Sequence, residues 1–132
     1  NIPIKLYNYG NHFRDFTYID DIVEGIYLSM LYNMKKLNKN QITTDVSSKP
    51  FTLFNLGSGR KTSLKKFVKL IEFNLGKKAQ IELLPIQLGD VVGTTANINK
   101  TKLELGYNPS TIPEEGIKKF IDWYKFYKKL DY

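Results

Sequence analysis

The most constraining stretch of this sequence runs from Arg14 to Met34, where a cation, an apolar run and a helical pattern follow one another directly. The run 16–19 consists of aromatic and β-branched residues, which favour an extended backbone. Asp21 and Glu24 have the spacing of a capping box, and acidic groups suit the positive end of a helix dipole. Apolar residues then recur at helical spacing as far as Met34. We therefore expect a loop that carries Arg14, then a buried strand, then a capped helix.

The rest of the chain alternates between extended and helical patterns. We expect further strands over residues 2–6, 51–56 and 81–84. Helices are expected after Thr62 or Ser63, over 99–105, and after a second capping box at Thr111 and Glu114. The continuous apolar run at 51–56 predicts a strand buried on both faces, whereas 35–50 has little periodicity and indicates a surface connection. Strands that alternate with helices predict a mixed α/β fold.

Composition is that of an ordinary folded domain. The chain has 132 residues, of which 42% are hydrophobic and 25% charged, enough for one domain with a core. No apolar run is as long as a membrane span, and the first residues do not form a signal peptide. The absence of cysteine excludes disulfides and thiolate metal sites, and a single histidine argues against structural zinc. We expect a cytoplasmic protein with no metal site and no membrane partner.

The net charge of +7 has two interpretations. Such an excess suits nucleic acid or phosphorylated small molecules. The lysines, however, are scattered in pairs that fall opposite the apolar faces of the expected helices. Only two residues are arginine, whereas proteins that read nucleic acids use arginine heavily. We therefore expect a solvated basic surface and no nucleic-acid partner, with a stand-alone basic binding module as the alternative.

Two loops carry side chains that suit a phosphorylated nucleoside. The guanidinium of Arg14 is a planar fork of donors that fits a phosphate; the alternative is a structural ion pair with Asp15 or Asp20. In the loop Gln87-Leu88-Gly89-Asp90, a carboxylate beside a glycine is a natural acceptor for ribose hydroxyls. The alternative there is an ordinary Gly-Asp turn.

Three other positions are weaker candidates. His12 lies two residues before Arg14 and is a candidate for contact with a sugar, although a single loop histidine is more often exposed to solvent. Tyr7 or Tyr9 is a candidate for a place beside the same substrate. Arg60 follows the turn 57–59, and its alternative interpretation is a solvated cation at the start of a helix.

Several ordered motifs together resemble a known family. They are Tyr7–Gly10, Arg14–Glu24, Phe54–Gly59, Gln87–Val91, Leu105–Pro109, Glu115–Ile117 and Trp123–Tyr124. They resemble the C-terminal half of the NAD-dependent nucleotide-sugar epimerases, which are extended short-chain dehydrogenase/reductases. The residues of these motifs are most similar to those of UDP-glucuronate 4-epimerases of the capsular-polysaccharide type, and the resemblance covers nearly the whole chain.

The resemblance implies that residues 1–132 form the nucleotide-sugar-binding portion of an extended Rossmann-type enzyme, with an incomplete sheet and a small substrate-binding subdomain. Arg14 would contact the diphosphate and Asp90 the ribose. Gln87 stands where many members of the wider superfamily have arginine, and it would supply hydrogen bonds without charge. In the complete family enzyme, NAD takes hydride from C4 of the UDP-sugar while a tyrosine, assisted by a lysine, removes the hydroxyl proton.

The oxidising part of such an enzyme is not visible in this sequence. No Gly-x-Gly-x-x-Gly turn is present, since 57–59 is followed by Arg, Lys and Thr. Tyr124 and Lys128 have the family's catalytic spacing, but their context matches its terminal helix. We therefore expect no catalytic residue and no NAD bound by this chain alone. The chain would be a fragment or split gene product that needs a polypeptide supplying the NAD-binding half, or a non-catalytic remnant. An open sheet edge also predicts self-association.

Overall fold

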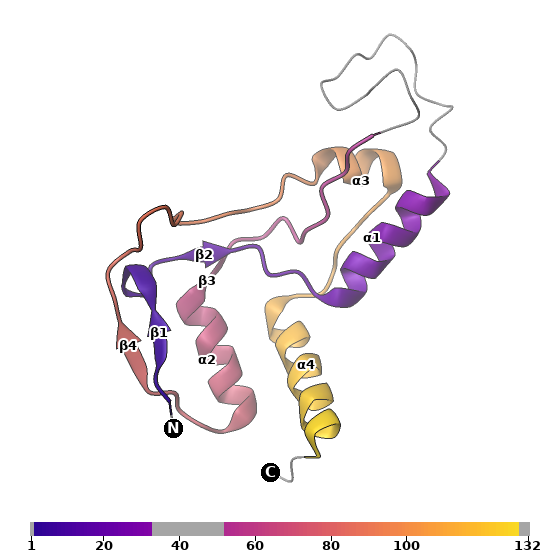
Figure 1. Ribbon diagram of the computed structural model, residues 1–132. Helices are drawn as coiled ribbons and strands as arrows, with labels where there is room; N and C mark the ends of the chain where they lie inside the picture. The colour runs from indigo at the N-terminus through magenta and orange to yellow at the C-terminus, as the bar shows by residue number, and fades with distance from the viewer. Residues whose placement is uncertain (1, 33–51, 130–132) are drawn as a thin grey trace.

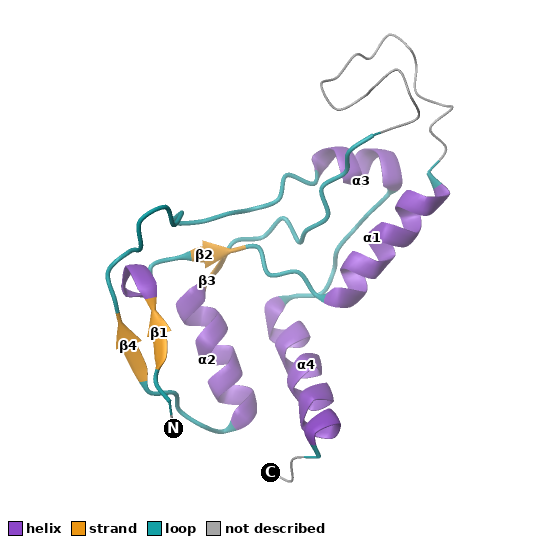
Figure 2. Cartoon of the chain, viewed as in Figure 1, coloured by secondary structure: helices purple, strands orange, loops and turns teal. Residues whose placement is uncertain are grey.

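The computed structural model describes residues 2–32 and 52–129. Its elements, in order, are β1 (Ile4–Leu6), the 3-10 turn η1 (Tyr7–Gly10), β2 (Phe13–Arg14), α1 (Ile19–Leu31), β3 (Thr62–Ser63), α2 (Leu64–Leu75), β4 (Ile81–Leu83), α3 (Asn99–Leu105) and α4 (Pro113–Lys128). Helices and short strands follow one another along the chain (Figure 2), which confirms the mixed α/β class. The predicted end of the first helix at Met34, the connection 35–50 and Phe51 lie outside the described residues.

The molecule has two ends joined by extended chain (Figure 1). At one end β1 pairs in parallel with β4, with Ile4 opposite Ile81, and α2 lies beside them. At the other end α1 packs with α3. Between them β2 pairs antiparallel with β3, and α4 packs along α2. The extended segments that join the two ends run beside β2, so this strand lies near the middle of the molecule.

Helix α2 begins and ends where the sequence predicts. The hydroxyl of Ser63 accepts a hydrogen bond from the backbone N–H of Lys66 at 3.2 Å, which is a standard N-cap. Gly76 ends the helix in the left-handed conformation, with φ of 65°. Buried apolar side chains from β1, α2, α4 and the chain on either side of α3 form a small core: Leu6, Val68, Ile98, Tyr107, Ile117 and Ile121.

The strands predicted at 16–19 and 51–56 are wrong over the residues described. Residues 16–18 are extended but unpaired, and α1 already begins at Ile19. Residues 52–56 are also unpaired, and they alternate between half-buried and exposed positions instead of being buried on both faces. A strand needs backbone partners on its neighbours. Within the described ranges, the hydrogen bonds that neighbouring segments make to residues 52–56 come mainly from side chains. Thr101 Oγ1, for example, donates to Asn55 O at 2.7 Å.

The two predicted capping boxes are also wrong, for one shared reason. Asp21 lies inside α1, and its carboxylate accepts bonds from the backbone N–H of Ser110 at 3.3 Å and of Thr111 at 3.2 Å. The Thr111 hydroxyl donates to the same carboxylate at 3.2 Å. Each residue therefore satisfies the other, and Ile112 becomes the N-cap of α4 without a side-chain bond. This buried contact fixes the start of α4 against α1.

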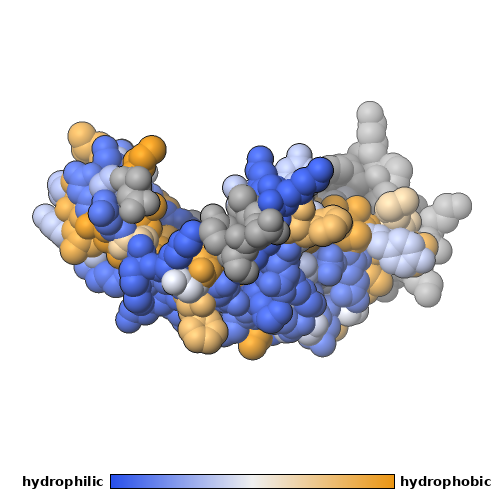
Figure 3. All heavy atoms as spheres, turned by 90° about the horizontal axis from the view of Figure 1, so that it is seen from below, coloured by the Kyte–Doolittle hydropathy of each residue, from blue (hydrophilic) through white to orange (hydrophobic). Residues whose placement is uncertain are grey.

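Large apolar side chains remain exposed on two of the helices. Figure 3 shows hydrophobic residues at several places on one face of the molecule. On α1 they are Ile19, Val23, Ile26, Tyr27, Met30 and Leu31, and on α4 they are Phe120, Trp123, Tyr124, Phe126 and Tyr127. Within the described residues, none of the helices combines the length and apolar character that crossing a bilayer requires.

Candidate functional site

The site is built where β2 meets the loop that follows β4. The backbone N–H of Phe13 donates to Val92 O at 3.1 Å, and a single parallel bridge pairs Phe13 with Gly93. A Cβ at position 93 would lie 2.1 Å from the Phe13 ring, so only glycine allows this close approach. The approach carries the turn Gln87–Asp90, closed by a bond from Asp90 N to Gln87 O at 3.1 Å, to the side of β2.

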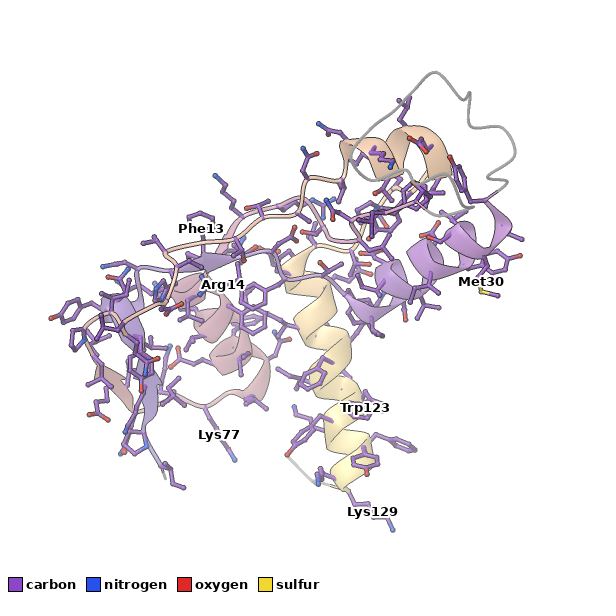
Figure 4. The ribbon with its side chains drawn as sticks, turned by 45° about the horizontal axis from the view of Figure 1, so that its top comes forward. Phe13, Arg14, Met30, Lys77, Trp123 and Lys129 are labelled. Carbon is purple, nitrogen blue, oxygen red and sulfur yellow. The ribbon has the colours of Figure 1, made fainter. Side chains whose placement is uncertain are left out.

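Arg14 and Asp90 meet at this junction. Arg14 Nη2 lies 3.1 Å from Asp90 Oδ1, and Nη1 donates to Phe13 O at 2.9 Å and to Val92 O at 3.3 Å. Figure 4 labels Arg14 and Phe13 on β2, near the chain that follows β4. Both charged side chains are partly exposed, at 32% for Arg14 and 28% for Asp90. The structure therefore brings together two residues that the sequence assigns to one ligand, 76 positions apart.

This pairing corrects two expectations about Arg14. The residue lies in β2 and not in a loop before a strand. The alternative interpretation, an ion pair with Asp15 or Asp20, has the wrong partners, because the carboxylate that Arg14 contacts is Asp90. The cause is geometric, since successive side chains of an extended backbone point to opposite sides and Arg14 and Asp15 are neighbours.

His12 joins the cluster from the buried side. Its Nε2 lies 3.4 Å from Asp90 Oδ2, and its side chain is only 5% exposed. The alternative interpretation, that this histidine is exposed to solvent, is therefore wrong, because the residue precedes β2 and its carbonyl accepts a bond from Leu64 N at the start of α2. Contact of His12 with a sugar stays a prediction. The Asp90 carboxylate thus has one oxygen facing Arg14 and the other facing His12.

The remaining candidates lie outside this cluster. Gln87 and Tyr9 are both exposed to solvent, and their roles stay predictions. Tyr9 lies in η1 with φ of 53°, and its backbone N–H donates to Leu84 O at 2.9 Å. Arg60 is not a free cation: it donates to Pro109 O at 3.0 Å and to Thr111 O at 3.3 Å, just before α4.

Asp15 is the residue that sequence reasoning missed. Its Oδ1 accepts bonds from the N–H and hydroxyl of Ser58, and its Oδ2 accepts from Gly59 N at 2.9 Å and from Ala96 N at 3.0 Å. Burial raises the pKa of this carboxyl, but the hydrogen bonds from Ser58, Ala96 and Gly59 outweigh it and lower the pKa below its usual value. The available signal was the alternation of an extended chain, which turns Asp15 away from the face that Arg14 uses.

This network bears on cofactor binding. A dinucleotide pyrophosphate is held by free backbone N–H groups of a glycine-rich turn. In the turn 57–59, the N–H groups of Ser58 and Gly59 already donate to Asp15. The turn therefore does not fit that role. Among the described residues, no cluster of three or more carboxylate or imidazole groups is arranged to hold a metal ion.

Comparison with known proteins finds relatives among UDP-glucuronate 4-epimerases. No protein-family model matches the chain. The chain is 38% identical over 131 residues to protein CapI of Staphylococcus aureus, covering 96% of this chain and 39% of that protein. It is also 38% identical over 128 residues to a probable UDP-glucuronate 4-epimerase of Rhizobium meliloti, covering 92% of this chain and 37% of the relative.

The fold is similar to that of the same enzymes. A UDP-glucuronic acid 4-epimerase from Bacillus cereus, solved in complex with UDP-glucuronic acid and NAD, matches with a TM-score of 0.72 and 24% identity over 95% of this chain and 36% of its own. The match shows that the described elements belong to a Rossmann-type epimerase fold. By sequence and fold together, the chain is a homologue of one part of the NAD-dependent nucleotide-sugar epimerases, and it spans between about a third and two fifths of the length of the relatives named here.

Proposed function

We propose that this chain is the UDP-sugar-binding portion of an NAD-dependent nucleotide-sugar 4-epimerase of the UDP-glucuronate or UDP-glucose type. In this proposal, residues 1–132 correspond to the C-terminal part of a cytoplasmic enzyme of surface-polysaccharide biosynthesis. The observation that carries it is the contact between Arg14 and Asp90 at 3.1 Å, with both side chains partly exposed. The name of the Rhizobium meliloti relative and the ligand of the Bacillus cereus enzyme support UDP-glucuronate as the first substrate to test.

Arg14 is proposed to bind the diphosphate. A guanidinium has five N–H donors, and three donor contacts occupy Nη1 and part of Nη2. Donors on Nε and Nη2 therefore remain to make the first contacts with phosphate oxygens. A phosphate bound in this way gains charge-assisted hydrogen bonds, which are stronger than neutral ones.

Asp90 is proposed to accept hydrogen bonds from the ribose hydroxyls. Its carboxylate lies beside Arg14 at the rim of the site, so a ribose next to the diphosphate comes within its reach. Gln87 begins the same turn, and Tyr9 is exposed in η1; we place both at the edge of the substrate. The contribution of this chain is then to hold UDP so that the sugar is oriented for reaction. NAD would be held by residues outside this chain.

The proposal is tested by calorimetric titration with UDP and then UDP-glucuronate. Arg14→Ala should weaken UDP binding by roughly tenfold to a hundredfold, the usual cost of losing hydrogen bonds to a charged group. Lys118→Ala is the matched control. It removes the same charge from an exposed ion pair with Asp122 on α4 and should leave binding unchanged. Absence of UDP binding by the unaltered chain would contradict the proposal.

A stand-alone basic module is the competing function. Several described lysines are paired with carboxylates, including Lys66 with Glu114 at 2.6 Å and Lys119 with Glu115 at 2.8 Å. This local pairing reduces the charge available to a polyanion. Salt-sensitive binding to duplex DNA or RNA, with no response to UDP, would favour the module. A folded chain that binds neither ligand would be a remnant.

The exposed apolar face of α1 supports a further protein partner. Val23, Tyr27 and Met30 lie on it and are each more than half exposed, and patches of this kind mark interaction surfaces. We propose that a polypeptide supplying the NAD-binding half covers this face, and that a second copy covers it when that polypeptide is absent. Gel filtration at high concentration tests the second statement, which a clean monomer would contradict.

A further inference from the structure

We infer that His12 is a positioning residue that holds the Asp90 carboxylate in the orientation a ribose needs. The inference rests on the UDP site proposed above and adds a buried residue to it. It starts from one unsatisfied atom. His12 Nε2 is buried and has no hydrogen-bond partner among the described residues, although Asp90 Oδ2 lies 3.4 Å away.

A buried ring nitrogen without a partner is costly, so its position calls for an explanation. The distance of 3.4 Å is longer than a good hydrogen bond to a carboxylate, which is about 2.7–2.9 Å. A shift of Asp90 by about half an ångström toward His12 would close the bond. The site is therefore built with a second anchor for Asp90 that is within reach but not yet engaged.

A hydrogen bond from His12 to Asp90 becomes important when UDP binds. In the structure, Asp90 Oδ1 is held by Arg14 at 3.1 Å. A diphosphate competes for the same guanidinium and draws it away from the carboxylate. A carboxylate that loses its partner turns freely and orders a ribose poorly. Bonding of Oδ2 to His12 keeps Asp90 in place while Arg14 turns toward the phosphates.

A merely structural histidine predicts something different. If His12 only fills space beneath β2, its loss weakens every ligand to the same degree. If it positions Asp90, its loss matters only for ligands that have ribose hydroxyls. Comparing UDP with 2′,3′-dideoxy-UDP separates the two cases, because the two molecules share the base and the diphosphate.

The experiment measures the affinity of both ligands for the unaltered chain, His12→Leu and His12→Gln, with thermal unfolding as a check that each variant folds. His12→Leu should weaken UDP binding by about tenfold, the cost of one hydrogen bond to a charged group, and leave dideoxy-UDP unchanged. His12→Gln places an amide N–H near the position of Nε2 and should recover most of the lost affinity. Equal weakening of both ligands, or no weakening of either, would overturn the inference.

A second measurement needs no substitution. His12 is the chain's single histidine, so its imidazole nitrogen resonances can be assigned without ambiguity. Titration with UDP should move the Nε2 resonance, and dideoxy-UDP should move it much less; equal movement, or none, overturns the inference. The two proposals fail separately. If the unaltered chain binds no UDP, both fall; if binding depends on Arg14 but not on His12, only this inference falls.

Discussion

Asp15 and Asp90 are two carboxylates that lie against the same short strand in opposite circumstances. Asp15 accepts bonds from Ser58, Gly59 and Ala96, which come from two separate extended segments. Asp90 is contacted by two side chains, Arg14 at 3.1 Å and His12 at 3.4 Å. The first carboxylate is enclosed by backbone donors of the fold, whereas the second lies at the rim beside a cation that still has donors to offer.

The difference shows how the end of strand β2 and the residue after it serve two purposes. Arg14 and Asp15 are adjacent, and an extended backbone turns them to opposite sides. On one side, Asp15 ties together the segments that join the two ends of the molecule. On the other, Arg14 takes part in the candidate site. Substitutions at Asp15 should therefore damage the fold, and substitutions at Arg14 should damage only binding.

Asp15→Asn should have the largest effect on stability. In this variant the negative charge is lost, and one carboxylate oxygen is replaced by an NH₂ group. This donor then faces backbone N–H donors that need an acceptor. We expect a loss of about 3 kcal/mol in the free energy of unfolding, the scale for breaking charge-assisted hydrogen bonds in a partly buried network. Urea denaturation measures it. Asp122→Asn, at an exposed ion pair, is the control and should change stability by less than about 0.5 kcal/mol. Equal effects would contradict the comparison.

Tyr107→Phe should have a smaller effect on the same network. Tyr107 is completely buried, and its hydroxyl donates to Gly57 O at 3.0 Å, next to the turn that Asp15 binds. The variant leaves one carbonyl without its partner but keeps the ring. We expect a loss of about 1 kcal/mol in the free energy of unfolding, measured in the same denaturation series. A loss of unfolding free energy as large as that of Asp15→Asn would show that the network depends mainly on the Tyr107 hydroxyl.

The lowered pKa of Asp15 should make the stability of the protein depend on pH in the acidic range. Its folded-state pKa lies below the unfolded value, so its stabilising contribution is fully present above the unfolded pKa. That contribution is lost as the pH falls from the unfolded pKa, about 4, through the lowered folded one. Unfolding free energies of the unaltered chain should therefore fall below pH 4 more steeply than those of Asp15→Asn. Parallel curves for the two proteins would show that Asp15 is not preferentially ionised in the folded state.

The comparison also shows what a sequence can predict. Helix α2 was predictable because its signals are local: Ser63 caps it and Gly76 ends it. The strand at 52–56 failed because pairing depends on a neighbour that no local pattern supplies. The roles proposed for Arg14 and Asp90 rest on residue chemistry and family resemblance, but the contact between the two residues depends on the approach of Phe13 to Gly93. The burial of His12 likewise depends on a bond to the start of α2, 52 positions later.

Arg14→Ala should have the smallest effect on the fold. The ion pair with Asp90 is partly exposed at both partners, and pairs of this kind contribute about 0–1 kcal/mol to stability. The variant should therefore unfold within about 0.5 kcal/mol of the unaltered chain in urea while its affinity for UDP falls. Loss of UDP affinity with an unchanged free energy of unfolding would support a role for Arg14 in binding and not in stability. A loss as large as that of Asp15→Asn would instead show that Arg14, like its neighbour, holds the fold together, and the weaker binding of the variant would then report unfolding.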